Sequence, residues 1–327
     1  MARVFQVFSS RLNKFGGVKR HCINLCALFQ NDKEIFVTIL SDKAIGYLAF
    51  TKKAYLHISV FYKEIKAQNY DVIHIHGFVE FSAIQAIIIA KILGKKVIYS
   101  PHYHPVEYLQ HPFLGKLFFT CLLRPLLPFV SAIITISEID TAFFRKYHRN
   151  VIQIPHYYDK QCSQINSQIQ KKKNMILFVG RNEENKGIDY LYKLPSKYVV
   201  HCVTKGNLQR SDFIVHSDVS DEELDLLYRE ASLVVIPSRY EAFSYVALEA
   251  FAHGTPVVMS DRVQIANYLE GKSGYSIFSY GDYQDFLSAV DKTIGIDVDV
   301  NGILSIFDKN VIKNKYANIY KQVAKET

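Results

Sequence analysis

Short apolar runs alternate with longer amphipathic stretches along the whole chain. Uninterrupted apolar runs are typical of strands buried on both faces of a parallel sheet, and the stretches between them have the periodicity of helices that cover such a sheet. We interpret eight runs as strands: 4–8, 71–77, 96–100, 132–136, 151–155, 175–180, 233–236 and 256–258. The alternation predicts an α/β protein with two doubly wound, Rossmann-like domains.

The length of 327 residues also favours two domains, because it exceeds the usual size of one. Residues 162–174 are polar, lack periodicity and end in a lysine run, so they are the predicted linker. We therefore expect a first domain over 1–161 and a second over 175–310. A last helix, at about 311–324, has apolar residues at helical spacing.

Composition places the chain among ordinary globular proteins, with 49% hydrophobic and 21% charged residues. Neither a signal peptide nor an apolar run long enough to span a bilayer is recognisable, so we expect a cytoplasmic location. The five cysteines are odd in number and scattered, which agrees with reduced thiols in that compartment.

Positive charge is concentrated in the first half of the chain. Residues 1–173 contain 23 Lys and Arg against 10 Asp and Glu, whereas residues 174–327 contain 16 against 21. The basic half would be attracted to an anionic membrane surface. A peripheral location at the inner membrane face is therefore an alternative interpretation. Residues 111–129 are apolar with interspersed Lys116 and Arg124, as in an interfacial segment or a core helix. We find no nucleic-acid-binding motif and expect no such partner.

Two glutamates, Glu241 and Glu249, straddle a predicted helix start after the strand 233–236. Ligands of open α/β sheets bind at the carboxyl ends of strands, and helix N-termini favour phosphate there. Eight residues of helix span about 12 Å, comparable with the distance from a hexose through a diphosphate to a ribose. A bare pair at this spacing would be read as two solvated helix residues, but the βαβ context favours a sugar-nucleotide site.

Other candidate residues lie where predicted strands end. Arg181 and Lys186 place two cations at the carboxyl edge of the second sheet, where they would stabilise negative charge on a leaving diphosphate. Gly16 and Gly17 would allow a close approach to a ligand and present amides at a helix start.

Two H-x-H pairs, His74 with His76 and His102 with His104, suggest a metal centre. We do not expect one. Alternate strand positions point in opposite directions, which would leave one histidine of each pair with a structural role.

Together these motifs resemble the retaining glycosyltransferases of family 4, and the resemblance covers nearly the whole chain. The matching segments are E-x7-E at 241–249 before Gly254-Thr-Pro-Val-Val, G-R-x4-K-G at 180–187, and Gly16-Gly17-Val-Lys-Arg-His. The resemblance implies the GT-B fold, with two domains facing across a cleft and the last helix, about 311–327, packed back on the first. It also implies sugar transfer from a nucleotide-diphosphate donor with retention of anomeric configuration, without a metal or other cofactor.

The resemblance also assigns roles to individual residues. The segment Ser100-Pro-His102 matches the place where the family sets a histidine against the donor sugar, so His102 would bind the sugar or stabilise an oxocarbenium-like transition state. The expected catalytic residues are His102, Glu241, Arg181 and Lys186. The expected donor-binding residues are Gly16, Gly17, Arg181, Lys186, Glu241, Phe243, Ser244, Tyr245 and Glu249.

Departures from the family pattern limit what can be carried over. Ala242 and Ser244 replace two glycines, and Val263-Gln264 with Asn267 replace a glycine pair and a glutamate that shape the sugar pocket. The donor sugar is therefore left open. For the acceptor we expect a saccharide, lipid-linked in view of the basic first domain, in surface polysaccharide assembly of the O-antigen or capsule type. The alternatives are a catalytically degenerate GT-B partner subunit and a GT-B epimerase or phosphorylase.

Overall fold

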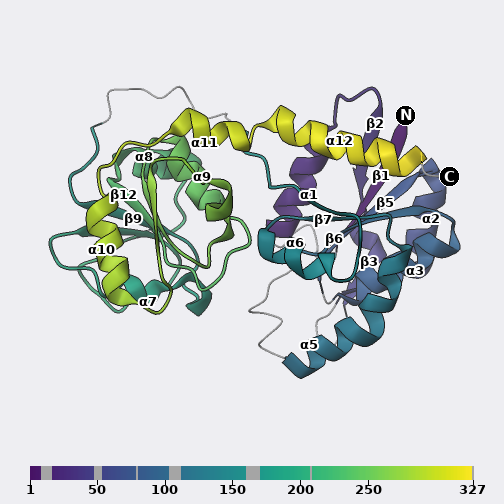
Figure 1. Cartoon of the computed structure of the whole chain (residues 1–327), viewed down its shortest axis with the longest axis horizontal. Coiled ribbons are helices and arrows are strands. Elements are labelled where there is room, and N and C mark those ends of the chain that lie inside the picture. Colours follow the sequence, from purple (N-terminus) through teal and green to yellow (C-terminus); the bar gives the residue numbers. More distant parts are fainter. Residues whose placement is uncertain are drawn as a thin grey trace. The chain divides into compact units, whose positions relative to one another are not determined.

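The structure is a computed structural model of the chain and describes residues 1–8, 17–47, 54–78, 80–102, 112–159, 170–206 and 208–325. The chain forms two compact units, which are treated separately below. Unit 1 consists of Met1–His156 and Lys309–Thr327, and unit 2 of Tyr157–Asp308. Each unit contains a six-stranded parallel sheet flanked by helices, as the α/β pattern predicts (Figure 1).

Unit 1 is built on the strand order β2-β1-β5-β6-β7-β8, in which all neighbours are parallel. Its strands are β1 Ala2–Val7, β2 Ile35–Ile39, β5 Val72–His76, β6 Lys96–Ser100, β7 Ala132–Thr135 and β8 Val151–Gln153, with a small antiparallel pair, β3 Ile45–Tyr47 and β4 Ala54–Leu56. Its helices are α1 Gly17–Leu28, α2 Ile58–Gln68, α3 Phe81–Ile92, α5 Pro112–Phe118, α6 Glu138–Arg145 and α12 Lys309–Lys325, with the short turns η1 Asp42–Ala44, η2 Phe119–Leu123 and η3 Arg124–Phe129.

Unit 2 repeats this plan with the parallel order β11-β10-β9-β12-β13-β14. Its strands are β9 Met175–Val179, β10 Val199–Val203, β11 Ile214–His216, β12 Leu233–Ile236, β13 Val257–Ser260 and β14 Tyr275–Phe278. Its helices are α7 Ile188–Leu191, α8 Asp221–Glu230, α9 Tyr245–Ala252, α10 Tyr283–Thr293 and α11 Val300–Ile306, with the turns η4 Glu184–Lys186 and η5 Gln264–Tyr268.

The central strands are buried along their whole length, which explains their uninterrupted apolar sequences. Every residue of β5, β7, β12 and β13 is buried. Burial of each large apolar side chain stabilises the folded state by about 1.5–3 kcal/mol relative to exposure. Helix starts are specified locally. Ser220 and Glu223 form a reciprocal capping box at α8, and Asp282 accepts hydrogen bonds from two amides at α10.

Helix α12 packs on the sheet of unit 1 through five buried side chains: Ile312, Tyr316, Ile319, Tyr320 and Val323. Lys313 forms an ion pair with Asp32 at 2.9 Å. The predicted linker, 162–174, lies largely outside the described residues. The limits 1–161 and 175–310 stay a prediction, beside compact units that divide at 156/157 and 308/309.

Candidate donor and histidine sites

Both sheets have a switch point, a place where the strand order reverses and the loops leave in opposite directions. In unit 1 it lies between β1 and β5, and in unit 2 between β9 and β12. Open α/β sheets bind ligands at the carboxyl ends of the strands beside such a point. The predicted residues Lys186 and Glu241 follow β9 and β12, and the histidines follow or end strands of unit 1.

Lys186 and Glu241 lie together in unit 2, with Nζ 3.4 Å from Oε1 and both side chains largely buried. The Ser238 hydroxyl donates a hydrogen bond to Glu241 Oε2 at 3.1 Å. Gly187 makes this geometry possible. Its φ is +67°, and a β-carbon there would lie 1.9 Å from the Pro237 carbonyl oxygen. Only glycine allows the turn that carries Lys186 to pack against the end of β12.

The loop that carries Glu241 is tied to the loop that departs from the family pattern. The Glu241 amide donates to the Arg262 carbonyl at 3.1 Å, and the Gln264 amide donates to the Glu241 carbonyl at 2.8 Å. Asn267 Nδ2 donates to Gln264 Oε1 at 3.3 Å. The backbone of the loop that departs from the family pattern therefore holds the backbone of Glu241 in place.

Glu249 is held by a neighbouring helix. The Tyr228 hydroxyl on α8 donates to Glu249 Oε2 at 2.8 Å. The Tyr228 ring is buried and stacks on His253, with centroids 5.5 Å apart and planes 9° apart. Tyr228 was not among the predicted residues. Only its buried position on the amphipathic helix before β12 could have pointed to it.

Three other predicted donor-binding residues lie at the start of α9. Ser244 is fully buried and caps the helix, with its hydroxyl accepting a hydrogen bond from the Ala247 amide at 3.3 Å. The Phe243 ring contacts the rings of Tyr245 and Phe307, with centroids 5.5 Å and 5.6 Å away. These contacts give Ser244 and Phe243 structural roles at the helix start, and their contact with a donor stays a prediction.

Arg181 lies apart from the Lys186–Glu241 pair. Its side chain is 76% exposed and forms an ion pair with Glu183 at 2.8 Å. Exposed ion pairs contribute at most about 1 kcal/mol, so this one can readily be exchanged for a bound anion. Of the predicted residues in unit 1, Gly17 begins α1, whereas Gly16 and His104 lie outside the described residues.

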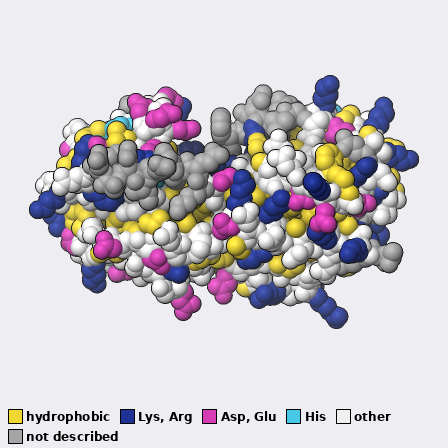
Figure 2. Space-filling model, turned by 90° about the horizontal axis from the view of Figure 1, so that it is seen from above, with side chains coloured by type: hydrophobic (Ala, Val, Ile, Leu, Met, Phe, Trp, Pro, Cys, Tyr) yellow, Lys and Arg dark blue, Asp and Glu magenta, His cyan; other side chains and the backbone are white. Residues whose placement is uncertain are grey.

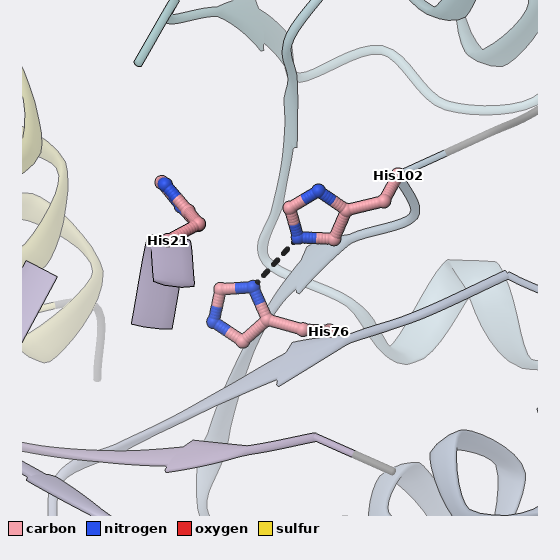
Figure 3. Close-up of side chains that lie close together, drawn as sticks. All are labelled: His21, His76 and His102. Carbon is pink, nitrogen blue, oxygen red and sulfur yellow. Dashed lines mark hydrogen bonds between the residues drawn. The ribbon is translucent and has the colours of Figure 1, made fainter. Parts of the chain in front are cut away.

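Five histidines gather at the carboxyl edge of the unit 1 sheet: His21, His74, His76, His102 and His156. His76 ends β5, and its Nδ1 lies 3.0 Å from Nε2 of His102 (Figure 3). His102 follows β6 with a φ of +48°, a left-handed conformation that is uncommon outside glycine. The His21 ring, on α1, lies 4.3 Å from that of His156, centroid to centroid.

The premise that the two histidines of an H-x-H pair point in opposite directions was wrong for His74 and His76. Residues two apart in a strand share a face, and their ring centroids are only 4.1 Å apart. His74 is anchored on both sides, with Nδ1 2.9 Å from the Tyr320 hydroxyl and Nε2 2.9 Å from the Ser100 hydroxyl. His74 thus connects the cluster to helix α12.

Loss of solvation keeps these imidazoles neutral at neutral pH. It lowers the pKa of His102 to about 4 and the pKa values of His74 and His156 to about 3, with neighbouring positive charge contributing to the latter two. It also holds the pKa values of His21 and His76 well below their usual range. A neutral His102 can donate one hydrogen bond and accept another, as contact with a sugar hydroxyl requires.

Two family models match the chain in succession. The model described as "Glycosyltransferase Family 4" matches residues 15–160, and the model described as "Glycosyl transferases group 1" matches residues 159–297. A Klebsiella pneumoniae protein described as "Uncharacterized 41.2 kDa protein in cps region" is 26% identical over 80% of this chain and 82% of its own length.

Solved structures share the fold over the full length. The structure titled "lipopolysaccharide outer core galactosyltransferase WaaB apo form" matches with a TM-score of 0.71 and 14% identity, covering 98% of this chain and 99% of that one. A structure of Anabaena Alr3699/HepE in complex with UDP matches with a TM-score of 0.67 and 15% identity, covering 98% and 100%.

The two parallel sheets and these matches define the class, which is that of the two-domain α/β glycosyltransferases with the GT-B fold. Within this class, the chain belongs to glycosyltransferase family 4, as the two successive family models indicate.

Proposed function

We propose that this glycosyltransferase moves a sugar from a nucleotide-diphosphate sugar to a saccharide acceptor with retention of configuration, and needs no metal or other cofactor. The observation that carries the proposal is the Lys186–Glu241 pair at the switch point of unit 2. The lysine ammonium suits a leaving diphosphate, because fixed positive charge stabilises the negative charge that develops on it. The Glu241 carboxylate would accept hydrogen bonds from sugar hydroxyls.

The remaining donor contacts follow from the same unit. Glu249, oriented by Tyr228, would accept hydrogen bonds from the ribose hydroxyls. Arg181 would exchange its exposed ion pair with Glu183 for the diphosphate. The structural neighbour with bound UDP makes uridine diphosphate the first nucleotide to test. In unit 1, neutral His102 would bind a hydroxyl of the donor sugar.

For the acceptor we propose a lipid-linked saccharide at the cytoplasmic face of an anionic membrane, in the assembly of surface polysaccharides. Unit 1 carries 24 Lys and Arg against 10 Asp and Glu, whereas unit 2 carries 15 against 21. Figure 2 shows many Lys and Arg side chains on the face of unit 1 that it presents. The capsule-region relative and the lipopolysaccharide galactosyltransferase neighbour support this kind of acceptor.

A surface on unit 1 fits contact with such a membrane. In the segment α5–η2–η3, Phe119 and Leu123 are buried in the core, whereas Leu117, Leu122 and Phe129 are 49%, 44% and 43% exposed. We call these three exposed side chains the apolar face. Lys116 and Arg124 lie in the same segment and supply the positive charge that anionic headgroups attract. Among the described residues, no helix is both long and apolar enough to cross a membrane.

A transfer assay tests the proposal. UDP-, GDP-, dTDP- and ADP-sugars are each offered with lipid-linked and water-soluble saccharides in the presence of EDTA. We expect acceptor-dependent release of nucleoside diphosphate from one donor class, with NMR couplings that show the donor's anomeric configuration in the product. Sugar phosphate or an epimerised donor without transfer would indicate a GT-B phosphorylase or epimerase. No turnover with any pair would favour a catalytically degenerate partner subunit.

A further inference from the structure

Three histidines of unit 1 have the arrangement of metal ligands. His21 on α1, His76 at the end of β5 and His102 after β6 each offer one ring nitrogen, and these three atoms lie within 4.8 Å of one another. Figure 3 shows the three rings around a shared space, each reaching it from a different element. The three histidines are far apart in the sequence. They come together because α1 follows β1, and the strands β1, β5 and β6 are consecutive in one parallel sheet.

The nitrogen separations are close to those of a bound ion. His76 Nδ1 and His102 Nε2 are 3.0 Å apart. Two nitrogens bound at about 2.0–2.1 Å in tetrahedral geometry are about 3.3 Å apart. The hydrogen bond between these two nitrogens would be replaced by bonds from both lone pairs to one ion, and His21 would need to approach by at most about 1.5 Å.

A second feature of the cluster points to a missing ligand. Nε2 of His76 is buried and has no hydrogen-bond partner in the described part of the chain. Buried polar atoms are rarely left unpaired, because loss of solvation without a hydrogen bond costs about 1–3 kcal/mol. An ion bound to Nδ1 would leave the proton of the His76 ring on Nε2, the nitrogen that metal-bound imidazoles use to donate a hydrogen bond to an acceptor such as water. His102 is partly exposed, whereas His21 and His76 are buried.

The donor set determines the class of ion. Three imidazoles and no carboxylate make up the group. Mg²⁺ and Ca²⁺ require oxygen ligands, whereas Zn²⁺, Co²⁺, Ni²⁺ and Cu²⁺ bind imidazole well. Burial keeps the pKa values of all three rings below the usual range, so their lone pairs are available at neutral pH.

We propose that His21, His76 and His102 form a binding site for a divalent transition-metal ion such as Zn²⁺, and that the bound ion inhibits sugar transfer. Binding stands on the cluster itself. Inhibition rests on the proposed function, because an ion on His102 would take that ring away from the donor sugar. The ion would thus be an inhibitor of an enzyme whose reaction does not use it.

The binding test is a titration of Co²⁺ into the full chain without an affinity tag, followed by visible absorption, with a parallel Zn²⁺ titration by calorimetry. We expect one ion per chain and the intense visible bands of tetrahedral cobalt. His21→Gln and His76→Gln should each weaken binding at least about tenfold, because each removes one ligand. Thermal unfolding of each variant checks that it is folded. If the His76→Gln variant does not fold, the His21→Gln variant alone tests the site.

A second histidine pair in the same chain provides the matched control. His201 Nδ1 lies 2.9 Å from His216 Nε2, and the rings stack with centroids 5.1 Å apart. This pair in unit 2 resembles the His76–His102 pair, so His201→Gln should leave the high-affinity ion in place. Absence of the cobalt bands, unchanged binding in a folded His21→Gln variant, or loss of binding in His201→Gln would each overturn the site.

Inhibition is measured in the transfer assay. Zn²⁺ should slow transfer by the wild type over the concentrations at which it binds, and EDTA should restore the rate. Full activity with the site occupied would overturn inhibition while leaving binding intact. A chain that never transfers sugar would overturn the proposed function, and inhibition with it, whereas the cobalt titration would still decide the site.

Discussion

At the scale of single residues, the proposed donor site depends on the conformation of Gly187. Its left-handed φ and the carbonyl of Pro237 together exclude a side chain. Lys186 immediately precedes it and reaches Glu241 only because the turn closes in this way. The positions of the two charged groups are therefore set by a residue that contributes no functional group itself.

We predict that Gly187→Ala destabilises unit 2 by at least about 2 kcal/mol, because backbone strain adds to the clash with Pro237. Urea unfolding of the variant measures this loss. Gly254→Ala is the matched control. Gly254 has a φ of +64°, and no atom lies within 4 Å of the place that a β-carbon would take, so this variant should lose only about 1 kcal/mol. Equal losses in the two variants would show that the close approach to Pro237 is unimportant.

The carboxyl group of Asp140 should make the free energy of unfolding depend on pH. Burial raises the pKa of Asp140 to about 7. Between the ordinary aspartate pKa of 3.8 and about 7, the folded chain holds a proton that the unfolded chain has lost, so this carboxyl makes stability fall as the pH rises. We predict that Asp140→Asn becomes more stable than the wild type as the pH rises through this range, by up to about 4 kcal/mol. Thermal unfolding of both proteins at pH 4 to 8 measures this difference in stability. A difference that does not change with pH would refute the raised pKa of Asp140.

At the scale of elements, helix α8 holds Glu249 of helix α9, a residue of the proposed donor site. Tyr228 on α8 donates its hydrogen bond to Glu249 on α9, and stacking on His253 holds its ring in place. The two helices are consecutive and are joined through the buried strand β12, so the contact lies within one helix–strand–helix segment.

We predict that Tyr228→Phe weakens nucleoside diphosphate binding about fivefold, as expected from the loss of about 1 kcal/mol of hydrogen bonding at Glu249. The control is Tyr275→Phe, which removes a hydroxyl that donates to the Leu269 carbonyl at 3.0 Å in the same unit. Calorimetry should find this control unchanged. If Tyr228→Phe binds as tightly as the wild type, Tyr228 does not position Glu249.

Some elements could be predicted and others could not, for physical reasons. The buried parallel strands were predictable because both of their faces must be apolar. The segment 111–129 left two interpretations open, and the structure describes residues 112–129 of it. Its structure is a helix, a π-helical turn and a 3-10 turn with Pro125 and Pro128, and it has one buried and one exposed face. The bridge between Glu241 and Val263 joins two loops and leaves no local pattern.

At the scale of the whole molecule, the division of charge between the two units suggests separate tasks. The basic unit 1 suits an anionic surface, and unit 2 contains the Lys186–Glu241 pair of the proposed donor site. Motif spacing predicted that Arg181, Lys186 and Glu241 lie where strands of the second sheet end. It did not predict His21 or His156, because histidines so far apart in the sequence meet only where the strands of one sheet end.

We predict that the chain binds vesicles containing phosphatidylglycerol, and that Leu117→Asp with Leu122→Asp weakens this binding at least about tenfold. The matched control is Leu226→Asp in unit 2, since Leu226 and Leu122 are both 44% exposed. Vesicle flotation at low and high salt measures the effect, which should diminish as salt screens the basic unit. No binding by the wild type, or an equal effect of Leu226→Asp, would exclude the apolar face as the contact.

The most direct test of the central claim is a calorimetric titration of UDP, GDP, dTDP and ADP into the wild type, Lys186→Met and Glu249→Ala. Glu222→Ala, which changes an exposed glutamate in the first turn of α8, is the control. The account predicts that one of these nucleotides binds, that Lys186→Met and Glu249→Ala each weaken it at least about tenfold, and that Glu222→Ala does not. Binding of none of the nucleotides, or unchanged binding by both site variants, would contradict it.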